Sequence, residues 1–179
     1  MSLDLRERQR PLKDRYRQDP DSARLVHSVH TVLLPDDPLH ARITSDGNTG
    51  GHTWEIAAHA MASGPDGEAC SGDLLLAALA GCQEITIKMV AAAMGIALDD
   101  LRVTVTGEMD FRGTMGVDRD VPVGYQRINC EIHIRAQGDP ARLRRMVEKA
   151  EQYCVVRDTL IRGVPVESHV SVENMAPAI

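Results

Sequence analysis

The segment from about Asp73 to Met94 constrains the fold more than any other part of the chain. Ala, Leu, Ile, Met and Val occupy nearly all of its helical faces, and Gly95 follows it as a favourable C-cap. A helix that is apolar almost all round is expected to be buried. Glu84 and Lys88 stand one turn apart, so we expect them to pair where the helix reaches water. The pattern therefore predicts a fold built around one long helix.

Two regular strand patterns follow this helix. Apolar and polar residues alternate from Leu101 to Thr106 and again from Arg127 to Arg135. Such alternation is typical of antiparallel strands with one face in water. After them, Asp139 and Pro140 are a favourable N-cap and first helical residue, and they predict a second helix that ends near Cys154.

Shorter elements complete the expected order. A helical turn is expected up to about Arg162, and a hairpin turn at 45–48. Further strands are expected at 25–34, 41–44, 53–59 and 164–172. Strands, helix, strands, helix and strand in this order predict an α+β fold, in which an antiparallel sheet wraps on a long buried central helix.

The first 24 residues differ in composition from the rest. They are charged throughout, with few large apolar residues, among them Leu5, Leu12 and Tyr16, and they lack the apolar core of an export signal. We expect 1–24 to form a charged helical arm, solvated or docked on a partner, and 25–179 to form the main domain.

Charge and aromatic content argue against several classes of partner. A net charge of -6 does not suit a protein that neutralises phosphates, and an aromatic content of 3% leaves little to stack on bases. The apolar stretch from Leu74 to Cys82 is shorter than the roughly 20 residues that a spanning helix needs. We therefore expect a cytoplasmic protein with no nucleic-acid partner and no membrane.

The four cysteines are the candidate reactive groups. In a reducing compartment, a disulfide is more often catalytic or redox-sensing than structural. Cys82 lies in the middle of the long helix, as a small core residue or as the floor of a pocket. Cys154 lies where a helix stops and the next turn starts; the amide groups there and Arg157 favour a thiolate, while packing at a cap is an equally common role. We interpret Cys130 as a core residue and Cys70 as an incidental loop thiol.

Other kinds of site lack their motifs. The sequence contains no Cys-x-x-Cys pair, no Gly-x-Ser-x-Gly elbow and no phosphate-binding glycine loop. We therefore expect neither a metal nor a cofactor.

Three segments together resemble a known family. SGDLLLAALAGC at 71–82, followed by Thr86, is similar to the first cysteine motif of the OsmC/Ohr family (osmotically inducible protein C and organic hydroperoxide resistance proteins). GEMDFRG at 107–113 and AEQYCV at 150–155 are similar to later segments of that family, in the right order. The resemblance covers about 25–173.

The resemblance implies a thiol-dependent peroxidase in an intertwined homodimer, with active sites at the subunit interface. It implies that Cys82 attacks a peroxide and that Cys154 resolves the product, with a dithiol as the reductant. Family peroxidases also use an Arg from the early strands, held by an acid just ahead of the cysteine helix. Arg42 and Asp73 are the candidates here, and Asp73 is shorter than the usual Glu. Val155 stands where the family often has Pro.

The peroxidase hypothesis makes two demands on the structure. The sulfurs of Cys82 and Cys154 must be able to meet, because a disulfide needs Cα atoms within roughly 7 Å. A cation, with Arg42 as first choice, must offset the rise in thiol pKa that an apolar helix causes. Two alternatives stay open: a non-catalytic dimer that binds a small apolar ligand or a protein partner, and a purely structural dimer without a cleft at Cys82.

Overall fold

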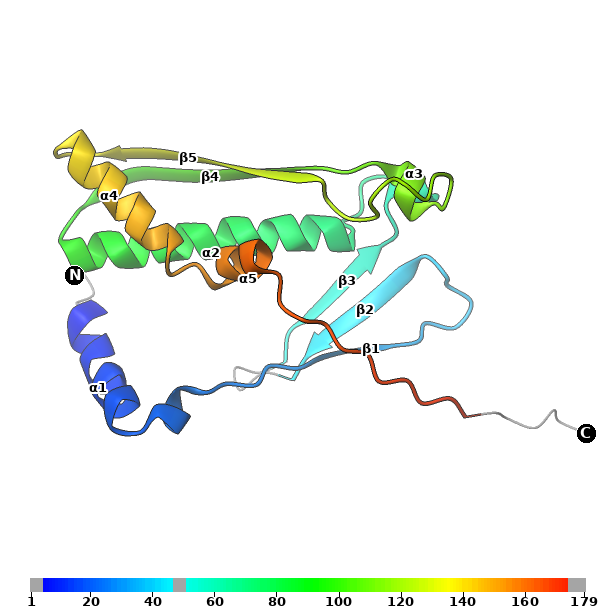
Figure 1. Ribbon diagram of the computed structural model, residues 1–179, viewed down its shortest axis with the longest axis horizontal. Helices are drawn as coiled ribbons and strands as arrows, with labels where there is room; N and C mark the ends of the chain where they lie inside the picture. The colour runs from blue at the N-terminus through cyan, green and yellow to red at the C-terminus, as the bar shows by residue number, and fades with distance from the viewer. Residues whose placement is uncertain (1–4, 47–50, 174–179) are drawn as a thin grey trace, which may run out of the picture.

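The long helix forms the axis of the molecule. The computed structural model describes residues 5–46 and 51–173, and in it α2 runs from Ser71 to Met94. Figure 1 shows the hairpin of β4 (Leu98–Glu108) and β5 (Arg127–Ala136) along one side of α2. The sheet of β1, β2 and β3 lies on the other side of the helix (Figure 1). The predicted α+β class and long central helix are confirmed.

Local capping sets both ends of α2. At its start, the Asp73 carboxylate accepts a hydrogen bond of 2.8 Å from the backbone N–H of Cys70, the N-cap residue. At its end, Gly95 adopts the left-handed conformation, with φ of 65°, which glycine reaches without steric cost. The predicted C-terminus is confirmed, and the helix begins two residues before Asp73.

The main core lies between α2, the β4–β5 hairpin and α4 (Pro140–Glu151). Its buried residues come from all three regions of the chain: Ile87, Val90, Ala91, Ile96, Met146 and Ala150. The Asp139 carboxylate caps α4 by accepting from the N–H groups of Ala141 and Arg142, as its position predicts. α5 follows as a separate short helix from Val155 to Arg162.

The strands form two antiparallel sheets. β1 (Val29–Val32), β2 (His40–Ser45) and β3 (Thr53–Ala57) make a three-stranded sheet in that order. Among the described strands, β4 pairs with β5 alone. A short helix, α3 (Phe111–Thr114), lies in the long end of the β4–β5 hairpin. The predicted turn at 45–48 lies partly outside the described residues.

The strand predicted at 164–172 is wrong for this chain. Residues 164–173 have no regular secondary structure and are exposed. Their valines alternate with other residues at Val164, Val166, Val170 and Val172, as in a strand, and each is more than half exposed. Alternation alone does not make a strand, because the backbone groups of a strand need a neighbouring strand for their hydrogen bonds.

The N-terminal segment is helical, as its composition predicts. α1 runs from Leu5 to Gln18, and the 3-10 helix η1 from Pro20 to Ala23 follows. The Arg6 guanidinium donates to the carbonyl oxygen of Ala93, so α1 touches the C-terminal turns of α2 (Figure 1).

One chain covers α2 only in part. Its buried residues form one side of the helix, whereas Leu75, Ile85 and Met89 are 37%, 56% and 39% exposed. Lys88 Nζ and Glu84 Oε1 pair at 2.7 Å on the outer face, as predicted. By length and composition α2 is also able to cross a membrane, a test that the core helix of a soluble protein passes as well. The prediction of a helix buried all round is therefore met on one side only within a single chain.

Candidate functional site

The fold brings the two predicted cysteines together. Cys82 lies in the middle of α2, and Cys154 is the N-cap residue of α5, where the chain turns after α4. Cys154 is completely buried and Cys82 is half-buried. The two side chains are hydrogen-bonded to each other as free thiols. The two side chains are thus close enough to interact within one chain, and a disulfide between them stays a prediction.

The N-terminus of α5 is directed at the sulfur of Cys82. The backbone N–H groups of Val156 and Val155 are hydrogen-bonded to this sulfur. The first N–H groups of a helix have no partner within the helix and carry a partial positive charge. They therefore stabilise a thiolate at Cys82.

These contacts lower the pKa of the Cys82 thiol. Burial, the largest single influence, raises the pKa, but it is outweighed by hydrogen bonds from the Val156 N–H, the Cys154 thiol, Thr86 and the Val155 N–H. Each of these donors is uncharged. Uncharged hydrogen-bond donors thus lower the pKa of Cys82, an effect for which the sequence alone led us to expect a nearby cation.

Cys154 is shifted in the opposite direction. Burial raises the pKa of its thiol, and the adjacent Cys82 sulfur raises it further, against a smaller lowering by the Arg157 N–H. The amides of Arg157 and Val156 at the start of α5 do lower the pKa of Cys154, as its position predicts, but burial and the adjacent Cys82 sulfur outweigh them. The surroundings thus lower the pKa of the Cys82 thiol and raise that of the Cys154 thiol.

Thr86 is a third member of the site. Its hydroxyl donates to the carbonyl oxygen of Cys82 at 2.7 Å, and the same hydroxyl lies within hydrogen-bonding reach of the sulfur. One hydroxyl proton serves only one acceptor at a time. Ionisation of Cys82 makes the sulfur the stronger acceptor, so the hydroxyl is placed to turn toward it. The spacing of four residues on one helix is the sequence signal for this contact.

Arg42 and Asp73 have other partners. Arg42 Nη2 lies 2.7 Å from Glu55 Oε1 across the β2–β3 pair, and Arg42 is not among the groups that set the pKa of Cys82. Asp73 caps its own helix, and the N–H of Cys70 lowers the pKa of its carboxyl. Asp73 precedes Cys82 by more than two turns of α2, which places it about 13 Å along the axis. A single chain thus brings neither residue to the reactive sulfur.

The other two cysteines occupy different surroundings. Cys130 lies on β5 opposite Val105, and burial raises the pKa of its thiol. Cys70 is the N-cap residue of α2 rather than a loop thiol without a role. Within 5–46 and 51–173, no group of three His, Cys, Asp or Glu side chains is arranged to hold a metal ion.

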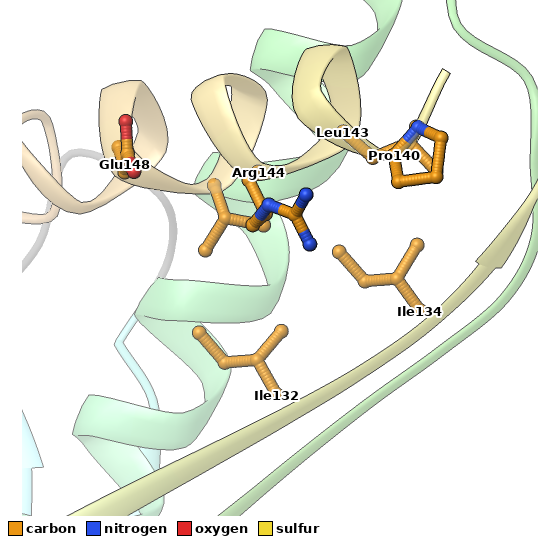
Figure 2. Close-up of a pocket in the computed structure, with 7 residues that line it drawn as sticks. Ile132, Ile134, Pro140, Leu143, Arg144 and Glu148 are labelled. Atoms are coloured by element: carbon orange, nitrogen blue, oxygen red, sulfur yellow. The ribbon is translucent and has the colours of Figure 1, made fainter. Parts of the chain in front are cut away.

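A cavity of about 410 Å³ lies apart from the cysteines, between β5 and α4 (Figure 2). Ile132 and Ile134 project from β5 toward Leu143 and Pro140, and Arg144 lies between the two elements. Neither Cys82 nor Cys154 lines this cavity. The Cys82–Cys154 pair therefore lies outside this cavity.

Comparison with known proteins gives a consistent match. The model of the family described as OsmC-like protein matches residues 64–169. This range contains both Cys82 and Cys154 but not Arg42. No curated protein matches the sequence.

Solved structures share the fold at low sequence identity. An OsmC-like protein from Mycoplasma pneumoniae is 21% identical, with a TM-score of 0.59 over 78% of this chain and 89% of its own. An OsmC-like protein of unknown function from Vibrio cholerae is 12% identical, with a TM-score of 0.61 over 76% and 94%. An organic hydroperoxide resistance protein from Elizabethkingia anophelis is 17% identical, with a TM-score of 0.56 over 79% and 91%. At these identities the likeness concerns the fold.

Proposed function

The chain belongs to the OsmC-like protein family, and from this premise we propose that it is a thiol-dependent peroxidase that reduces organic hydroperoxides or hydrogen peroxide. The observation that carries the proposal is the placement of Cys82, in the middle of α2, against Cys154 and the first amides of α5. Cys82 has a lowered pKa and the Cys154 thiol in hydrogen-bonding contact has a raised one. The sulfur that attacks the peroxide must be a thiolate. Some structural neighbours are themselves named organic hydroperoxide resistance proteins.

The first step oxidises Cys82 and reduces the peroxide. The Cys82 thiolate attacks the terminal oxygen of ROOH, an S–O bond forms and the O–O bond breaks. The leaving alkoxide takes a proton from water and departs as ROH, and Cys82 becomes a sulfenic acid. The amides of Val155 and Val156 hold the attacking sulfur as an anion before this step.

The second step forms the disulfide. The sulfur of Cys154 attacks the Cys82 sulfenic acid, and the hydroxyl leaves with the Cys154 proton as water. A dithiol reductant then exchanges with the disulfide, returns both cysteines to thiols and is itself oxidised. The contact between the two side chains means that the second step needs little movement.

We further propose that the protein acts as a cytoplasmic homodimer. The exposed apolar residues of α2 and the unpaired valines of 164–172 would gain burial from a second copy. In such a dimer, Arg42 and Asp73 would have a catalytic role only if one copy brings Arg42 to the Cys82 of the other. Cross-linking and sedimentation velocity of the whole chain test the dimer.

The decisive experiment measures peroxide consumption with a dithiol reductant. We expect Cys82→Ser to abolish turnover and Cys154→Ser to prevent disulfide formation while leaving one round of Cys82 oxidation. A dimedone probe should label Cys82 in the Cys154→Ser variant after peroxide is added. Cys70→Ser and Cys130→Ser are the matched controls and should keep full activity. Equal rates for wild type and Cys82→Ser would favour a non-catalytic binding protein instead.

A further inference from the structure

A second cavity lies beside the central helix. It occupies about 420 Å³ between α2, β5 and α5, a size that suits a small molecule. Leu79, Ile128, Leu160 and Ile161 supply apolar walls. The reactive cysteines are not among the lining residues, so this space is separate from the peroxidase chemistry proposed above.

Gln83 lines this cavity and has no hydrogen-bonding partner there. Its side chain is 0% exposed, and within the described residues neither its amide nitrogen nor its amide oxygen is paired. Buried amides in folded proteins are almost always hydrogen-bonded, because an unpaired one loses its bonds to water without replacement. Two unpaired atoms on one buried amide therefore point to a group that this chain does not itself supply.

The charged residues of the cavity favour a polar group with acceptor atoms. Arg157 and Arg127 line it together with a single acid, Glu151. Arg157 Nε lies 3.6 Å from Glu151 Oε1, and within 5–46 and 51–173 its guanidinium has no other ion pair or hydrogen bond. The lining thus combines hydrogen-bond donors with apolar side chains.

We infer that this cavity binds a small apolar molecule that ends in a carboxyl or carboxamide group, with Gln83 and Arg157 as the residues that hold that group. The amide nitrogen of Gln83 donates to the carbonyl or carboxylate oxygen of the ligand. Its amide oxygen accepts from a carboxamide N–H, or from the Arg157 guanidinium when the ligand is a carboxylate. The chain of the ligand packs on the leucine and isoleucine side chains.

Cys130 provides a local reporter, because it also lines the cavity. The test uses the full chain with Cys82→Ala and Cys154→Ala, so that binding is measured without any peroxidase activity. The rate of iodoacetamide alkylation is followed separately at Cys130 and at Cys70 by mass spectrometry, with octanoate, octanamide or 1-octanol added. Failure of this proposal and failure of the peroxidase proposal are therefore distinguishable.

Octanoate or octanamide is expected to slow alkylation of Cys130 about tenfold at saturation and to leave the alkylation rate of Cys70 unchanged. The probe that binds more tightly shows whether the ligand ends in a carboxyl or a carboxamide group. Gln83→Met should weaken that binding about tenfold, as the loss of one hydrogen bond predicts, and should not lower the melting temperature. Gln83→Leu is the second variant, and Glu84→Gln, on the outer face, is the control with unchanged binding.

The inference is overturned if neither probe protects Cys130, or if 1-octanol protects Cys130 as well as octanoate and octanamide do. It is also overturned if Gln83→Met changes the oligomeric state, because a second copy of the chain would then be the partner of Gln83.

Discussion

Replacing Val155 by proline removes one backbone N–H from the Cys82 sulfur with little other change. Val155 is the first residue of α5, a position at which proline is favoured because its N–H has no partner within the helix. The preceding residue, Cys154, is already extended, with φ of -77° and ψ of 105°, as a residue before proline prefers. The fold should therefore tolerate the change, while the thiolate at Cys82 loses a donor.

The expected effect is a lower rate of alkylation at Cys82. A hydrogen bond to a charged group contributes about 1.5–3 kcal/mol. The Val155 N–H is the weakest of the donors that lower the Cys82 pKa, so we use the low end of that range. About 1.4 kcal/mol corresponds to a tenfold change in an equilibrium constant. Below the pKa of Cys82, the thiolate fraction and hence the alkylation rate should fall about tenfold.

The assay is the pH dependence of iodoacetamide alkylation at Cys82, with Cys70 in the same sample as the internal reference. In Val155→Pro the midpoint for Cys82 should move to higher pH, and peroxide consumption at neutral pH should slow in parallel. Val155→Ala is the matched control, because it removes the same side chain and keeps the N–H. An unchanged midpoint in a folded Val155→Pro variant would refute the argument that α5 activates Cys82.

Three further predictions test other parts of the argument. Thr86→Val should raise the pKa of Cys82, seen as a shift of the same alkylation profile to higher pH, because the hydroxyl that turns toward the thiolate is lost. Ile87→Ala should lower the free energy of unfolding by about 2–5 kcal/mol in urea denaturation, whereas Ile85→Ala, at a position 56% exposed in one chain, should cost much less. His40 should titrate above its ordinary pKa in NMR, because the Asp37 carboxylate accepts a hydrogen bond from its ring. This raised pKa stabilises the fold below the ordinary histidine pKa, and the contribution should be lost as the pH rises through the shifted value.

Hydrophobic periodicity and capping residues were sufficient to predict α2, α4 and the β4–β5 hairpin. The apolar run closed by Gly95, the two alternating strands and the Asp139-Pro140 start are local patterns, and each formed the expected element. The valines of 164–172 are also a local pattern, yet no strand formed. A helix forms its backbone hydrogen bonds within one segment, whereas a strand needs a neighbouring strand for them, and the local sequence does not show whether one is present.

The sequence by itself determined the long helix, the hairpin beside it and the two cysteines that matter, because these follow from short-range patterns and from motifs that resemble the OsmC/Ohr family. Only the tertiary structure decided how those cysteines differ. Every residue except proline carries a backbone N–H, so no residue type in the sequence marks the amides of Val155 and Val156 as donors. They lower the pKa of Cys82 because the fold places the start of α5 against α2. The same packing buries Cys154 and raises the pKa of its thiol. The β2–β3 sheet in turn pairs Arg42 with Glu55. Ionisation of a thiol depends on distance and burial, and those quantities exist only once the chain has folded.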